Sequence, residues 1–243
     1  MRRSVALLSL FLAACSGGGG DDTGPVTPPP TPTIAVTLAP GAGTAARGAT
    51  TTTTVSLTRG GGYAGTVTLA ADALPAGVQV SFAPATLSGT TTSATATMSV
   101  GSTAAAGNTT VNISASGSGV TTASAAFALT VPTPGIGVSA AAAAVSMAQG
   151  TAANVAISVS RTNGYADAIA LTASGLPAGA TATFTPASVP AGTTASTLVF
   201  AVPATTPTGT YPVTITATGT GVASATTTVS LTCLLYTSPS PRD

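Results

Sequence analysis

The sequence predicts an all-β chain that folds as two β-sandwiches in tandem, and three observations support this fold class. Short runs of apolar residues alternate with Thr, Ser and Gln, which places alternate side chains on one face of a strand. Gly and Pro separate these runs, as turn residues do. The runs recur as two similar units of about 100 residues, the size of an ordinary domain.

The first element, residues 1–15, reads MRRSVALLSLFLAAC and has the pattern of an export signal: two Arg, a short apolar core and small residues before a Cys. Leu12-Ala13-Ala14-Cys15 resembles the lipobox of bacterial lipoproteins. The resemblance implies cleavage before Cys15 and a diacylglycerol on its thiol, with Ser16 favouring the outer membrane of a diderm host. The membrane is then a partner through the lipid anchor, and the protein is exported to the cell envelope or cell surface. An ordinary secretory signal with an incidental Cys is the alternative.

Residues 16–33 read SGGGGDDTGPVTPPPTPT and are predicted to form a disordered tether. Its Gly-rich half behaves as a flexible coil, and its Pro-rich half stiffens toward polyproline II. Such a segment would hold the first domain on the order of 25 to 50 Å from the membrane.

An internal repeat follows the tether. LPAG occurs at 74–77 and 176–179, and GYA at 62–64 and 164–166, so both pairs are 102 residues apart and align without a gap. One unit has been duplicated. We assign domain one to 34–131, a PTPG linker to 132–135 and domain two to 136–232. The short linker, which contains Pro, should restrict the relative motion of the two domains.

Each unit contains about seven short alternating runs, the number typical of an immunoglobulin-like sandwich, although neither unit has the Cys or Trp of antibody domains. The motifs GYAGTVTL and LPAGVQVSFAP in unit one, with GYADAIAL, LPAGATATFTP and GTYPVTITATGTG in unit two, resemble the bacterial immunoglobulin-like domains found in tandem in surface proteins. That resemblance implies display, spacing or adhesion. It transfers no binding residues.

The repeat alignment breaks after Thr232. The last eleven residues, CLLYTSPSPRD at 233–243, resemble the in-frame translation of a transposase-type sequencing adapter, and we exclude them from the fold. On this interpretation a DNA fragment ended there and further domains are missing. A genuine tail is the alternative.

The composition argues against a catalytic site. Only 5% of the residues are charged, and the chain has no His, Lys or Glu, so no general base for a Ser or Thr nucleophile is present. No basic cluster exists for nucleic acid. We therefore expect no catalytic residue, no cofactor and no metal, and no nucleic-acid partner. A weak calcium site built on Asn163, Asp167 and loop carbonyls is the one metal alternative.

Arg59 and Arg161 are the only charges that recur at matched positions, and each precedes the Tyr of a GYA motif, Tyr63 or Tyr165. These four residues are the candidate surface contacts. In one interpretation Arg binds a ligand and Tyr stacks on a sugar. In the other, which the paucity of aromatic residues favours, the Arg stem covers a strand end and stacks on the Tyr, which packs in the turn.

Taken together, the sequence predicts a non-catalytic cell-surface lipoprotein whose immunoglobulin-like domains act as a spacer or stalk or in surface interaction. One alternative is an adhesin or binding module for an unknown protein or glycan. A second is the accessory region of a truncated exported enzyme.

Overall fold

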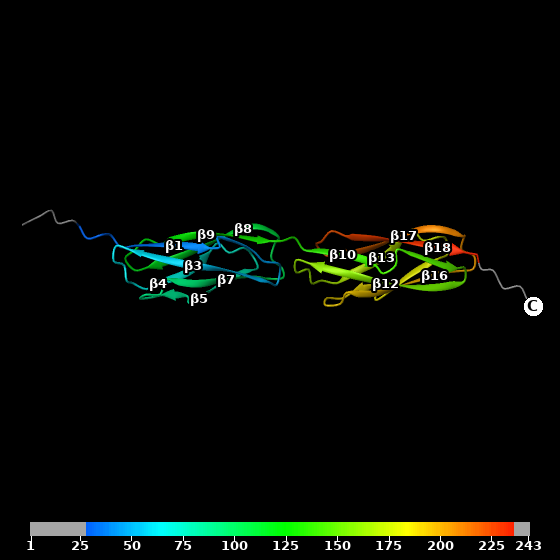
Figure 1. Cartoon of the computed structure of the whole chain (residues 1–243), viewed down its shortest axis with the longest axis horizontal. Coiled ribbons are helices and arrows are strands. Elements are labelled where there is room, and N and C mark those ends of the chain that lie inside the picture. Colours follow the sequence, from blue (N-terminus) through cyan, green and yellow to red (C-terminus); the bar gives the residue numbers. More distant parts are fainter. Residues whose placement is uncertain (1–27, 236–243) are drawn as a thin grey trace, which may run out of the picture.

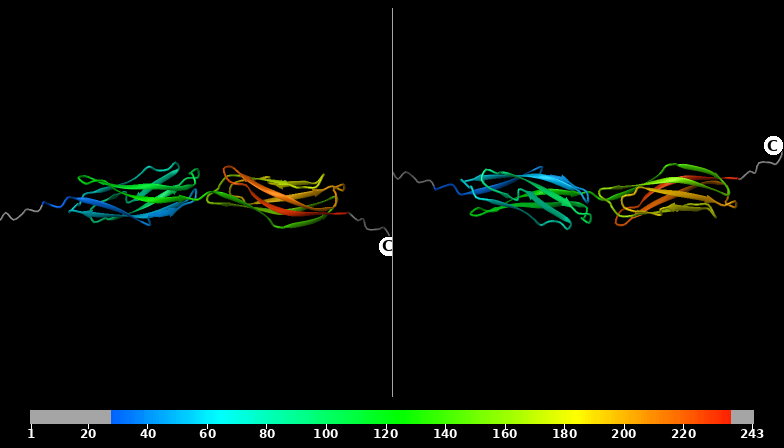
Figure 2. Two further views of the ribbon diagram at one scale, coloured as in Figure 1. Left: turned by 90° about the horizontal axis from the view of Figure 1, so that it is seen from above. Right: turned by 90° about the horizontal axis from the view of Figure 1, so that it is seen from below.

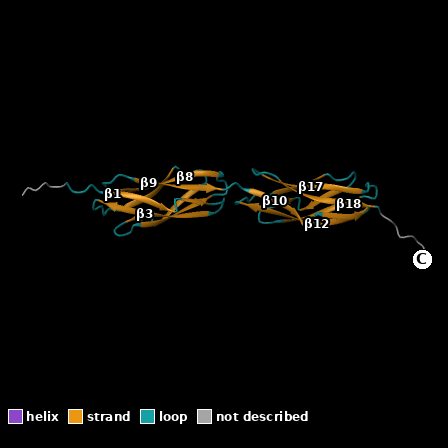
Figure 3. Ribbon diagram, turned by 45° about the horizontal axis from the view of Figure 1, so that its top comes forward, coloured by secondary structure: helices purple, strands orange, loops and turns teal. Residues whose placement is uncertain are grey.

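The structure, a computed structural model, describes residues 28–235. The predicted leader, Cys15, most of the tether and most of the adapter-like tail fall in residues 1–27 and 236–243, which lie outside the described residues. Every regular element in the described range is a β-strand, as the alternating pattern predicts, and Figure 3 shows strands joined only by loops. None of the described segments is a helix long and apolar enough to cross a membrane.

Repeat one, the strands from Thr33 to Val131, is a sandwich of two sheets. Within the described chain its nine strands are β1 (Thr33–Ala39), β2 (Ala42–Thr44), β3 (Thr50–Gly60), β4 (Val67–Asp72), β5 (Val78–Ala83), β6 (Thr86–Leu87), β7 (Ser93–Val100), β8 (Gly107–Gly117) and β9 (Ala123–Val131). One sheet has the order β1-β3-β7-β5 and the other β2-β9-β8-β4-β6.

The strand order identifies the fold. With β1, β3, β7 and β5 as strands A, B, E and D, and β4, β8 and β9 as C, F and G, the two sheets follow the constant-type immunoglobulin arrangement. The first strand is divided between the sheets: β1 pairs antiparallel with β3, whereas β2 pairs parallel with β9. Pro40, which has no N–H to donate to a ladder, lies between the two parts. Both repeats are immunoglobulin-like sandwiches.

Repeat two, from Gly135 to Leu234, has the same plan. Its described strands are β10 (Gly135–Ala140), β11 (Ala144–Ala148), β12 (Thr151–Thr162), β13 (Ile169–Ser174), β14 (Thr181–Thr185), β15 (Ser188–Val189), β16 (Ala195–Val202), β17 (Gly209–Gly219) and β18 (Ala225–Leu234). The sheets are β10-β12-β16-β14 and β11-β18-β17-β13-β15. Each strand boundary lies within two residues of the position that the 102-residue offset gives.

Each repeat has a hydrophobic core of its own, which the period-two pattern builds directly. In β8, Val111, Ile113 and Ala115 are fully buried, whereas Asn112 between them is exposed. The largest fully buried side chains are Phe127 in repeat one and Phe200 in repeat two. A fully buried large apolar side chain contributes about 1.5 to 3 kcal/mol, and these cores take the place of the disulfide and Trp of antibody domains.

The structure differs from the predicted strand count in a simple way. About seven strands per unit were expected, and the described chain forms nine in each. The additional strands are β11 of repeat two, with five residues, and three segments of only two or three residues: β2, β6 and β15. A segment this short does not complete two alternations, so its hydrophobic pattern gives no signal.

The last strand also extends further than the sequence boundary at Thr232. β18 continues to Leu234, and Cys233 is buried opposite Gly209 and Met147. Cys233 fills the core position that Val131 fills in repeat one, and a free Cys packs there as a small apolar residue. The origin of residues 233–243 stays a prediction.

The two sandwiches are arranged end to end. In Figure 1 repeat one, blue to green, and repeat two, green to red, follow each other along the long axis, and both views in Figure 2 show the same arrangement. We call the end of a repeat at which its first strand begins the entry pole, and the end at which its last strand ends the exit pole. The exit pole of repeat one therefore faces the entry pole of repeat two.

Candidate functional site

Arg161 extends from β12 and holds the turn between β15 and β16. Its Nη1 donates to the Thr193 carbonyl at 2.5 Å, and its Nη2 donates to the carbonyls of Val189 and Pro190 at 2.9 and 3.0 Å. The Nε atom donates to the Asp167 carbonyl at 3.2 Å. The guanidinium fork thus donates to four backbone carbonyls, and the Pro190 carbonyl also accepts from the N–H and hydroxyl of Thr193.

Arg59 does the same in repeat one with fewer bonds. Its Nη1 donates to the Thr91 carbonyl at 3.0 Å and its Nη2 to the Leu87 carbonyl at 2.9 Å, at the positions that match Thr193 and Val189. Its Nε atom is buried without a partner. The two Arg therefore form a repeated clamp between strand B and the turn before strand E. Because backbone carbonyls of the same repeat accept from both guanidinium groups, at four bonds for Arg161 and two for Arg59, the geometry favours a structural role over a ligand contact.

Tyr165 packs inside its turn. The side chain is only 6% exposed, and its hydroxyl donates to the Ala168 carbonyl at 3.5 Å. The phenol lies against Gly219, where an added Cβ would be 2.8 Å from the Tyr165 Cζ. Tyr63 has the same contact with Gly117 but is half-buried. A sugar-stacking platform needs an open aromatic face, and Tyr165 offers none.

The acidic side chains of the described chain do not gather. Residues 28–235 contain no group of three or more His, Cys, Asp or Glu placed to hold a metal. Of the calcium candidates, Asn163 uses its amide Nδ2 to donate to the Thr133 carbonyl at 2.7 Å, and the Asp167 carbonyl accepts from Arg161. A guanidinium at that carbonyl opposes a cation beside it.

A second pair of matched residues was not singled out from the sequence. At the exit pole of repeat one, the Nε of Arg47 donates to the Ala104 carbonyl at 2.8 Å. At the same place in repeat two, the Nε2 of Gln149 donates to the Thr206 carbonyl at 2.5 Å. The 102-residue offset places Gln149 opposite Arg47, and both are long donors. The sequence could have identified this pair only by the shared ability of Arg and Gln to donate a hydrogen bond, because their charges differ.

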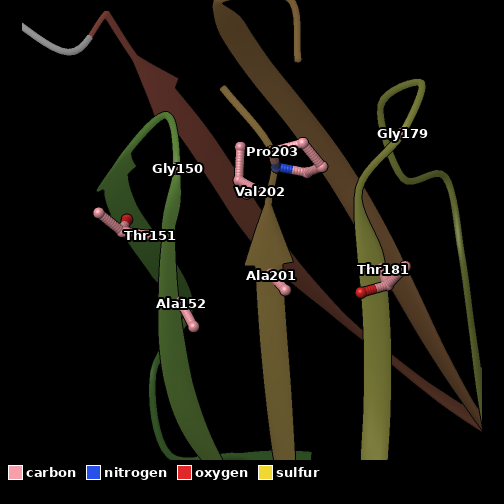
Figure 4. Close-up of a pocket in the computed structure, with 8 residues that line it drawn as sticks. All are labelled: Gly150, Thr151, Ala152, Gly179, Thr181, Ala201, Val202 and Pro203. Atoms are coloured by element: carbon pink, nitrogen blue, oxygen red, sulfur yellow. The ribbon is translucent and has the colours of Figure 1, made fainter. Parts of the chain in front are cut away.

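Two matching hollows on the surface of residues 28–235 are open and lined by uncharged residues. Figure 4 shows one of about 320 Å³ in repeat two, where Thr151 of β12, Ala201 of β16 and Thr181 of β14 line an open depression. A depression of about 390 Å³ lies at the matching place in repeat one, over Gln79 and Ser99. Ligand sites usually enclose the ligand and aim several polar groups at it. These hollows offer small side chains and two hydroxyls in Figure 4, so they suggest no particular ligand.

No protein-family model matches the chain, and no curated protein matches its sequence. Several solved structures match the chain at low identity. They include surface-layer protein SbsC domains 1–6, at 14% identity and a TM-score of 0.41 over 77% of this chain and 24% of that one. Domains 4 and 5 of the same protein match at 15% identity and a TM-score of 0.33, over 52% and 65% of the two chains.

The fibronectin(III)-like modules of Clostridium thermocellum CbhA match at 14% identity and a TM-score of 0.29, over 82% of this chain and 94% of theirs. The chain spans about two thirds of the length of the structure of SbsC domains 4 and 5, and about a quarter of that of domains 1–6. At these identities the likeness concerns the fold alone. The immunoglobulin-like assignment stands on the strand order of the chain itself.

Proposed function

We propose that this protein is a non-catalytic lipoprotein of the cell surface whose two sandwiches act as a spacer between the membrane and whatever the distal end carries. One observation carries the proposal: the chain enters the tandem at one end and leaves it at the other, with the two domains in line (Figure 1). A globular binding unit needs no such arrangement, whereas a stalk requires it.

The length of the domains makes the arrangement useful. Strand β3 has 11 residues, which at a rise of about 3.3 Å per residue spans roughly 36 Å. Two such domains in line reach roughly 70 Å. The predicted tether between Cys15 and β1 would add on the order of 25 to 50 Å.

The side chains support a role without chemistry. The candidate contact residues Arg59 and Arg161 are engaged by backbone carbonyls, and Tyr165 is buried. Within the described chain the remaining charges are Arg47, Asp72 and Asp167, and the two carboxylates are exposed on separate repeats. A general base poised near neutral pH needs burial or a close charged neighbour to tune it.

Anchoring is tested first, with the full chain produced in a diderm bacterium and labelled with a radioactive or clickable fatty acid. We expect label on the protein and recovery in the membrane fraction, and the Cys15→Ser variant should lose both. Recovery of the unsubstituted protein in the soluble fraction, without label, would contradict the lipid anchor.

The spacer role is tested by neutron reflectometry of the lipidated full chain on a supported bilayer. We expect a protein layer on the order of 100 Å thick, the sum of the rod and its tether. A layer of roughly 40 Å or less would contradict a stalk that projects from the surface. Stronger retention of cells on glycan or matrix-protein surfaces than with Cys15→Ser would replace the spacer with an adhesin.

A further inference from the structure

The turn after β12, at the entry pole of repeat two, meets the exit pole of repeat one through Gly164. This residue has a φ of +75°, a conformation that Gly adopts freely. A Cβ added to it would overlap the carbonyl oxygen of Arg47 and would lie 2.8 Å from the Arg47 carbonyl carbon and Cβ. The backbones of the two repeats are therefore in direct contact here, and only the absence of a side chain at 164 permits it.

The surface that receives Gly164 is itself fixed. Arg47 lies in the loop between β2 and β3, and its Nε bonds the Ala104 carbonyl in the loop between β7 and β8. The next residue, Gly48, donates its backbone N–H to the Val100 carbonyl at 2.8 Å. Two hydrogen bonds thus hold this loop to the body of repeat one, so the Arg47 carbonyl presents a defined contact point.

The linker is tied to the same turn. Asn163, which precedes Gly164, donates its Nδ2 to the carbonyl of linker residue Thr133 at 2.7 Å. The linker residue Pro134 is buried, although its counterpart before repeat one, Pro32, is exposed. A flexible linker between independent domains would leave its residues in solvent. Here the linker, the turn and the loop of Arg47 are in contact, with Pro134 buried, while Thr133, Asn163 and Gly164 keep exposed surface.

Repeat one has the same turn, and no other part of residues 28–235 lies against its Gly62. Gly62, the counterpart of Gly164, has the same φ of +75°, and an added Cβ there would meet nothing within 4 Å. Gly61 replaces Asn163 and has no side chain to hold the segment before it. The two turns therefore share their local geometry, and only the turn of repeat two is packed against another domain.

We infer that Gly164, Arg47 and Asn163 form a docking seat that fixes repeat two on repeat one, so that the tandem moves as one stiff rod and not as two domains on a flexible linker. A fixed junction would give the proposed spacer its reach, so the biological role of the junction rests on the proposed function. The junction itself is a matter of geometry, which is measured in solution without any membrane.

The test is a set of residual dipolar couplings measured on the full chain, with Gly164→Ala against Gly62→Ala as a matched pair. Both substitutions place Ala at the same positive φ and carry the same local strain, but only the new methyl group at position 164 would meet the other domain. We expect one alignment tensor to fit both repeats in the unsubstituted chain and in Gly62→Ala. In Gly164→Ala the shared tensor should be lost, with a separate tensor for each repeat.

A need for two tensors in the unsubstituted chain would overturn the inference, and so would a shared tensor in Gly164→Ala. If Gly164→Ala unfolds repeat two, the pair Gly164→Asn and Gly62→Asn replaces it, because Asn tolerates positive φ better than other residues with a Cβ. With the Asn pair, two tensors in Gly164→Asn and one in Gly62→Asn would support the docking seat, and one shared tensor in Gly164→Asn would overturn it. A thin layer in reflectometry together with one shared tensor would reject the spacer and leave the docking seat intact.

Discussion

Thr206 is a polar residue in an apolar position, and replacing it should make repeat two more stable. The side chain is fully buried at the exit pole, and its hydroxyl Oγ1 has no hydrogen-bond partner. The counterpart in repeat one is Ala104, which is 1% exposed. The fold therefore tolerates a purely apolar side chain at this place.

The size of the effect follows from what each substitution removes. A buried hydroxyl without a partner costs about 1 to 3 kcal/mol relative to its hydrated state. Thr206→Val exchanges the hydroxyl for a methyl group of similar shape, so we expect the free energy of unfolding of repeat two to rise by about 1 to 2 kcal/mol. Thr206→Ala also removes the Thr methyl, worth about 0.8 kcal/mol, and should gain less.

The assay is urea unfolding of the full chain followed by resolved NMR signals of each repeat. The midpoint of repeat two should rise by about 0.5 M or more in Thr206→Val, and the midpoint of repeat one should stay unchanged. The reverse substitution Ala104→Thr should lower only the midpoint of repeat one. A midpoint of repeat two that stays the same or falls in Thr206→Val would show that the hydroxyl is satisfied in solution.

Three further results are expected. Arg161→Ala should lower the free energy of unfolding of repeat two by about 1 to 2 kcal/mol, and Arg59→Ala should lower that of repeat one by less. The reason is that four carbonyls lose a donor in the first variant and two in the second. Equal losses in urea unfolding would contradict this. Gly219→Ala should lower the melting temperature because the new Cβ meets the Tyr165 phenol, and Tyr165→Phe in the same chain should recover part of the loss by removing the hydroxyl. Burial raises the pKa of the Cys233 thiol above its ordinary value of 9.0, so unfolding releases a proton at alkaline pH. The free energy of unfolding of repeat two should therefore fall as pH rises beyond about 9, and a Cys233→Val variant should lack this part of the decline. Curves of unfolding free energy against pH that run parallel for the two proteins would refute it.

The strands themselves were predictable because burial in a sandwich follows the side-chain alternation of each strand. Val111 and Ile113 alternate with polar residues, and the structure buries both completely. The 102-residue offset then placed the strands of the second unit without further information. The short strands β2 and β6 escaped prediction because pairing with β9 and β4, and not their own sequence, makes them strands.

The candidate contact residues show where sequence reasoning ends. The sequence marked Arg59 and Arg161 as exceptional because they recur, but all of their carbonyl partners except that of Asp167 lie 28 to 32 residues away in the chain. Backbone carbonyls are identical in every residue, so no pattern of side chains announces which of them lack a partner. The Arg47 and Gln149 pair was missed for the same reason.

The sequence by itself determined the longer strands, the duplication and the low content of ionisable groups, because alternation, repetition and composition are properties of the chain. Only the tertiary structure decided which sheet each strand joins, where the Arg donors bind and that Gly164 touches Arg47. These depend on atoms far apart in the chain that meet only after the sheets have packed. A glycine has no side chain to reveal in advance what its backbone will lie against.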